Sequence, residues 1–91
     1  TIRCIMPRIS EFLGIFIYMY FSDHNPPHFH AVYGQFDAEF AVESGDRLAG
    51  AFPPRAERLV KEWADLYEKE LLENWIRARD HKPLAPIPPL E

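Results

Sequence analysis

The alternation of apolar and polar residues in the first half of the chain predicts a small β-sheet. Residues 9–21 form an apolar run rich in isoleucine, phenylalanine and tyrosine, which is typical of a strand buried on both faces. Residues 28–33 and 36–43 predict a second and a third strand, and the Gly-Gln pair at 34–35 fits a two-residue hairpin turn between them. Residues 47–52 predict a short fourth strand at the sheet edge.

The second half of the chain has the period of an amphipathic helix, from Pro53 to Arg79. Proline is well tolerated in the first turn of a helix, so Pro53-Pro54 marks the start. We favour two helices with a break near residues 68–70, because one helix of roughly 26 residues is long for a small domain. The apolar residues that recur at intervals of three and four, and that we expect to face the core, are Ala56, Leu59, Val60, Trp63, Leu66, Tyr67, Leu71, Trp75 and Ile76.

These elements together predict the fold class and the domain organisation. We expect an α+β fold in which a small antiparallel sheet of three to four N-terminal strands packs against one or two C-terminal helices. Residues 6–82 form the single domain in this interpretation. Residues 83–91, which contain four prolines, should form an extended tail draped on the surface. We interpret residues 1–5 as a non-native remnant or an extended start, and we exclude them from functional reasoning.

Composition and charge narrow the function classes. The chain of 91 residues is 47% hydrophobic and 14% aromatic, which is too apolar for a disordered protein. Its net charge of −4 argues against broad electrostatic binding of nucleic acid but leaves a small local contact open. The single cysteine, Cys4, excludes an intrachain disulfide and favours the cytoplasm. The longest apolar run, residues 12–21, is half of the ~20 residues that a membrane helix needs, so we expect no membrane association.

The residues best suited to chemistry lie close together in the sequence. Asp23, His24 and Asn25 share a short loop with a Pro-Pro pair, and the strand that follows carries His28 and His30. Rigid loops with several titratable groups are common places for functional sites. One of the two prolyl bonds is a candidate for the cis form. No glycine-rich phosphate loop and no nucleophile elbow is present in the sequence.

The expected hairpin register decides which of these side chains share a face. With the turn at residues 34–35, His30 lies opposite Glu39 and Phe29 lies opposite Phe40. The face that carries Phe29 and Phe40 should receive the helices. The opposite, polar face should gather His28, His30, Asp37, Glu39 and Glu43.

One interpretation of the polar face is a catalytic site. Histidine changes charge near neutral pH, and an adjacent carboxylate orients it and raises its basicity. His30 or His28 would then be the general base, with Glu39 as its orienting partner and His24 as a second acid or substrate contact. The residues that we expect to contact the ligand or target are Asp23, Asn25, Asp37 and Arg55.

Two other interpretations of the polar face stay open. A His-x-His pair on a strand with one carboxylate is a familiar metal-ligand set, so a divalent metal held by His28, His30 and Glu39 is the one cofactor that we consider. Alternatively, a histidine opposite a glutamate is an ordinary stabilising pair on a solvated strand face.

A set of short motifs runs along the chain from Met6 to Pro89. They are Met6-Pro7-x-Ile9-Ser10, Phe12-x-Gly14-Ile15, Tyr20-Phe21-x-Asp23-His24-Asn25-Pro26-Pro27-His28-Phe29-His30-Ala31-x-Tyr33-Gly34, Leu48-x-Gly50, Pro53-x-Arg55-Ala56, Val60-x-Glu62-Trp63 and Glu70-Leu71-Leu72-x-Asn74-Trp75. With these motifs the chain resembles the bacterial domain of unknown function family 4160. One position that is often acidic in that family is Val32 here, which argues against a carboxylate role at that position.

The resemblance implies a small cytoplasmic bacterial protein that is the toxin-like component of a toxin–antitoxin-type module. Its partner would be a cognate protein of family 2442, the antitoxin. The histidine stretch would be the surface through which it acts. The alternative is a non-enzymatic binding or regulatory module whose helical face or proline-rich tail docks on a partner protein. A homodimer through the edge strand at residues 47–52 is a further expectation.

Overall fold

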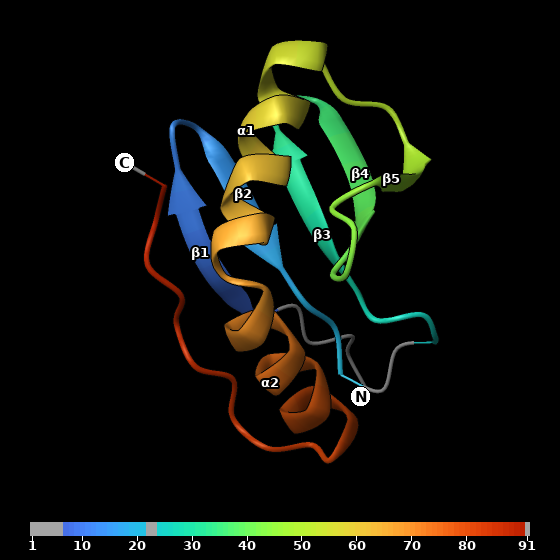
Figure 1. Cartoon of the computed structure of the whole chain (residues 1–91), viewed down its shortest axis with the longest axis vertical. Helices are drawn as coiled ribbons and strands as arrows, with labels where there is room; N and C mark the ends of the chain where they lie inside the picture. Colours follow the sequence, from blue (N-terminus) through green and yellow to red (C-terminus); the bar gives the residue numbers. More distant parts are fainter. Residues whose placement is uncertain (1–6, 22–23, 91) are drawn as a thin grey trace.

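The computed structural model describes residues 7–21 and 24–90. Within these ranges the elements are β1 (Arg8–Phe12), β2 (Ile15–Tyr18), β3 (His28–Tyr33), β4 (Phe36–Ala41), β5 (Arg47–Gly50), α1 (Pro54–Leu66) and α2 (Glu68–Arg79). The five strands form one antiparallel sheet in which neighbours in sequence are neighbours in space, in the order β1-β2-β3-β4-β5. Helix α1 packs across one face of the sheet, and α2 continues from it toward the end at which β3 begins (Figure 1).

The α+β fold class is confirmed, but the sheet has five strands rather than three or four. The apolar run at residues 9–21 was predicted as one strand, and this is wrong because a turn at Leu13-Gly14 divides it into β1 and β2. Both turn residues have positive φ, 53° and 82°. A tight two-residue hairpin requires such angles, which glycine adopts readily and leucine does not. Because Leu13 continues the apolar pattern, the sequence conceals this turn.

The predicted register of β3 and β4 is confirmed along its whole length. His30 lies opposite Glu39 and Phe29 lies opposite Phe40, as expected from a turn at residues 34–35. Strands β4 and β5 each end two residues earlier than predicted, and β5 lies at the sheet edge as expected. The alternation on either side of the turn therefore places each β3 and β4 side chain on its predicted face.

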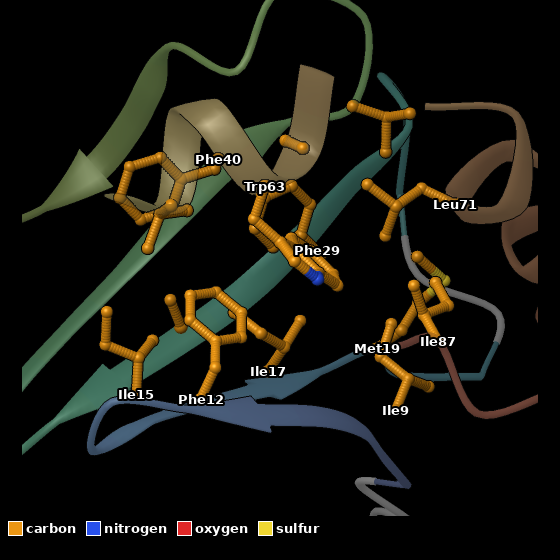
Figure 2. Packing of buried hydrophobic residues seen from close by; sticks show 14 of the residues in the cluster. Ile9, Phe12, Ile15, Ile17, Met19, Phe29, Phe40, Trp63, Leu71 and Ile87 are labelled. Carbon is orange, nitrogen blue, oxygen red and sulfur yellow. The ribbon is translucent and has the colours of Figure 1, made fainter. Parts of the chain in front are cut away.

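The core lies between the sheet and the helices, on the face predicted to receive them (Figure 2). The ring of Phe29 lies 5.7 Å from that of Phe40 and 5.7 Å from that of Trp63, measured between centroids. Ile15 and Ile17 of β2 are fully buried beneath them. Burying one such side chain contributes about 1.5–3 kcal/mol, so this layer is the main source of stability.

The described residues form two helices, as favoured, and the break falls at Tyr67, just before the predicted position. Two residues of the predicted apolar stripe were wrongly assigned to the core, because Leu66 and Ile76 are 62% and 48% exposed. Leu66 and Ile76 lie outside the buried stripe, which continues across the break at intervals of three and four residues. Asn74 and Ala78 occupy buried positions of that stripe in α2.

Residues 83–90 of the proline-rich tail form no helix or strand, and they run alongside β1 (Figure 1). The backbone N–H of Ile87 donates to the carbonyl of Ile9 at 2.8 Å, and the Trp63 indole N–H donates to the carbonyl of Pro88 at 2.9 Å. The side chains of Ile87 and Leu90 are buried in the core. The tail is thus held by directed contacts, and it covers the β1 edge, which would otherwise offer unpaired backbone groups.

Asn74 provides a further attachment for the tail. Its side-chain N–H donates to the carbonyl of Ala85 at 2.8 Å. Its side-chain oxygen accepts from the backbone N–H of Ala85, also at 2.8 Å. Asn74 is 1% exposed, so this reciprocal pair supplies the partners that a buried amide requires.

The interpretation of residues 1–5, including Cys4, lies outside the described residues. Across the ranges that are described, no helix has the length and apolar character needed to span a membrane.

Candidate functional site

Three separate segments bring titratable side chains together at the end of the sheet where β3 begins. His24 comes from the loop before β3, His28 and His30 from β3, and Glu39 from β4. The centroid of the His28 ring lies 5.0 Å from that of His24 and 5.2 Å from that of His30. We call these four residues, His24, His28, His30 and Glu39, the imidazole cluster.

The loop that carries His24 is anchored to the neighbouring strand. The backbone N–H of Val42, just after β4, donates to the carbonyl of Pro27 at 3.0 Å. The sequence left the state of the two prolyl bonds open, and the Asn25–Pro26 bond is cis. His24 and His28 lie on either side of the Pro-Pro segment in the sequence. The anchored loop places their two rings next to each other.

His28 is buried, and its orientation is set by the loop. The ring is 1% exposed and lies 5.2 Å from the ring of Trp75 in α2, measured between centroids. Its Nδ1 lies 2.8 Å from the carbonyl oxygen of Pro26. A carbonyl can only accept, so Nδ1 donates, and in the neutral ring the lone pair resides on Nε2. Nε2 in turn lies 3.8 Å from the Oε1 atom of Glu39.

His30 is covered from a direction that the sequence did not indicate. Its ring is 9% exposed and stacks against Tyr20, with 4.1 Å between the centroids. The expected polar face is therefore not a simple solvated surface at its histidines, because Tyr20 covers His30 and Trp75 covers His28. Neither aromatic residue was predicted to belong to the site, since each lies in a segment that the pattern assigned to the core.

A shallow hollow adjoins the cluster on the same face of the sheet. It is lined by Tyr20, His30, Asp37, Ala38, Glu39, Ala49 and Gly50. Two carboxylates, an imidazole and a phenol ring thus border a space that is open to solvent. The hollow shares His30 and Glu39 with the imidazole cluster.

The remaining predicted contact residues are distributed differently. Asp37 lines the hollow, and Asn25 is exposed in the loop beside His24. Arg55 lies at the other end of the sheet, in a small apolar pocket that also involves Leu13 and Tyr33, so the structure does not bring it to the cluster. Asp23 lies outside the described residues.

One subset of the cluster has metal-ligand geometry. Among the described residues, His24, His28 and Glu39 can each offer one ligand atom such that all three atoms lie within 4.8 Å of one another. The sequence suggested His28, His30 and Glu39 as the set, and the structure brings His24 into the place expected for His30.

Comparison with known proteins gives one match. A family model described as Domain of unknown function (DUF4160) matches residues 14–76, which is more than half of the chain and includes the whole imidazole cluster. No curated protein matches the chain, and no solved structure does.

Proposed function

This chain belongs to the DUF4160 family, and on that premise we propose that it is the toxin-like component of a bacterial toxin–antitoxin-type module that acts in the cytoplasm through the imidazole cluster. The observation that supports the proposal is the convergence of three histidines and one carboxylate from three chain segments. Such convergence of ionisable side chains from separate chain segments is typical of a working site. The proposed partner is a family 2442 protein that acts as the antitoxin.

The imidazole cluster combines exposed and buried side chains, and this difference suggests a role for each. His24 is exposed and can meet a target directly, whereas His28 is buried and held in one orientation by the Pro26 carbonyl. An imidazole held in one orientation beside a carboxylate is the arrangement of a general base that accepts a proton and returns it. In an enzymatic mode His28 is the base, Glu39 its charged neighbour, and His24 the second acid or target contact.

Induced expression in a bacterial host tests the proposal. We compare the native chain with a His24→Gln/Glu39→Gln variant, which changes the two accessible members of the cluster and leaves the buried rings in place. A His81→Gln/Glu43→Gln variant is the matched control, because it makes the same chemical changes at exposed residues outside the cluster. Soluble protein levels are measured alongside growth.

The proposal predicts that the native chain and the control arrest growth, and that the cluster variant does not. Growth arrest by all three chains at equal soluble levels would place the toxicity elsewhere. Normal growth with the native chain would contradict the toxin assignment.

A non-enzymatic binding module is the alternative, and one observation favours it. Leu66 and Ile76 are large apolar side chains exposed on the outer sides of the helices. The tail is less suited to docking, because its residues Ile87 and Leu90 are buried in the chain's own core. In this alternative a Leu66→Ser/Ile76→Ser variant loses function while the cluster variant keeps it. A homodimer through the exposed edge strand β5 stays a prediction.

A further inference from the structure

Three side chains of the imidazole cluster are placed closely enough to share one ion. Ligand atoms of His24, His28 and Glu39 all lie within 4.8 Å of one another. Tetrahedral zinc binds nitrogen and oxygen ligands at about 2.0–2.2 Å, so neighbouring ligand atoms lie about 3.3 Å apart. The distance of 3.8 Å from His28 Nε2 to Glu39 Oε1 is near that value. Small side-chain movements would therefore close the set around an ion.

His28 has the orientation that a metal ligand requires. Histidines that bind metal usually donate their other ring N–H to a carbonyl or carboxylate, which fixes the ring and raises the basicity of the ligating nitrogen. Here Nδ1 donates to the Pro26 carbonyl at 2.8 Å, and the packed ring of Trp75 holds the imidazole from the side of α2. Nε2 is consequently directed toward Glu39 before any ion arrives.

A cation placed between Nε2 of His28 and Oε1 of Glu39 would be attracted by both atoms, which lie 3.8 Å apart. A proton would bridge His28 and Glu39 alone, whereas a metal ion would also use His24, whose ligand atom lies within 4.8 Å of the other two.

The donor set indicates the class of metal. Two imidazole nitrogens and one carboxylate oxygen suit zinc and related divalent transition metals, whereas Mg²⁺ and Ca²⁺ prefer oxygen ligands throughout. His24 is exposed and the Glu39 side chain is 30% exposed, so an ion can enter from solvent. We propose that His24, His28 and Glu39 bind one divalent transition metal ion of the zinc class and leave one coordination position open. The inference rests on the proposed function in taking this cluster as the working site, and it names the ligand of that site.

Zinc titration of the full chain, purified without a histidine tag and stripped with a chelator, tests the inference. We expect saturable 1:1 binding by calorimetry, a higher melting temperature with zinc because the ion stabilises only the folded state, and reversal by chelator. Mg²⁺ should produce no shift. Co²⁺ should give the visible absorption of a low-symmetry site with nitrogen ligands.

The variants decide which side chains hold the ion. His24→Gln and Glu39→Gln should each weaken zinc affinity at least about tenfold, because even changes around a ligand cost about 10–100-fold. His81→Gln, a histidine outside the cluster, should leave the affinity unchanged. Loss of binding in His30→Gln with full binding in His24→Gln would overturn this ligand set. Absence of saturable binding, or native affinity in both ligand variants, would overturn the site itself.

This outcome is independent of the growth experiment. Cluster-dependent growth arrest without zinc binding would leave the proposed function standing and remove the metal. Zinc binding that depends on His24 and Glu39, without growth arrest, would establish the site and remove the toxin assignment.

Discussion

His28 and Glu39 approach each other diagonally across β3 and β4, with 3.8 Å between Nε2 and Oε1, although the residue directly opposite Glu39 is His30. The diagonal arises from contacts outside the hairpin. The Pro26 carbonyl and Trp75 orient His28, while Tyr20 stacks on His30. The hairpin places His28, His30 and Glu39 on one face of the sheet. Contacts with the loop, with α2 and with the residues after β2 then determine the orientation of the two imidazole rings.

The burial of His28 predicts a large stability difference between two neighbouring histidines. His28→Ala removes a packed ring and the hydrogen bond to Pro26, and it should lower the free energy of unfolding by about 2–4 kcal/mol. His24→Ala changes an exposed side chain and should cost less than about 0.5 kcal/mol. Thermal and urea unfolding of both variants measure the difference. Equal stability of the two variants would show that Trp75 does not cover His28 in solution.

The attachment of the tail through Asn74 can be tested in the same way. Asn74→Ala removes both hydrogen bonds to Ala85 and leaves backbone groups without their partner, so the free energy of unfolding should fall by about 2–3 kcal/mol. Glu73→Ala, at an exposed neighbouring position of α2, is the control and should be nearly neutral. Urea unfolding followed by tryptophan fluorescence suits this measurement, because Trp63 contacts the tail at Pro88. A native midpoint for Asn74→Ala would mean that the tail contributes little to the fold.

The fold was predictable where local signals agree with the tertiary structure. The turn at residues 34–35 and the alternation on both sides of it determine the β3–β4 register, and Pro53-Pro54 determines where α1 begins. Sequence patterns fail to predict a turn where a residue adopts a backbone conformation that its type rarely adopts. Leu13 at a φ of 53° lies in a turn that its side chain does not indicate, so one strand was expected where two occur.

The tail shows a second limit of sequence patterns. Its prolines predict an extended chain, but Ile87 and Leu90 follow no period that would indicate burial. Their burial depends on Trp63 and Asn74, which lie in the helices and provide hydrogen bonds to the tail backbone. Hydrogen bonds of this kind join residues that are far apart in the sequence, and the spacing of apolar residues does not predict them.

The candidate site was located by sequence, but its internal arrangement was not. The spacing of His28 and His30 correctly places both on one face of β3. Strand alternation cannot describe the loop, so the approach of His24 to His28 and Glu39 was not foreseen as a ligand set. It depends on the hydrogen bond between Val42 and Pro27, which returns the loop to the sheet.

Whether His24 and Glu39 belong to one site is tested by a double-variant cycle on zinc affinity. It compares the native chain with His24→Gln, Glu39→Gln and the combined variant. The effects of changing two ligands of one ion should be strongly non-additive, because loss of either ligand already removes most of the affinity that the other contributes. We predict that the double variant binds zinc scarcely more weakly than either single variant. Losses that simply multiply, or an affinity that neither change alters, would contradict a shared site.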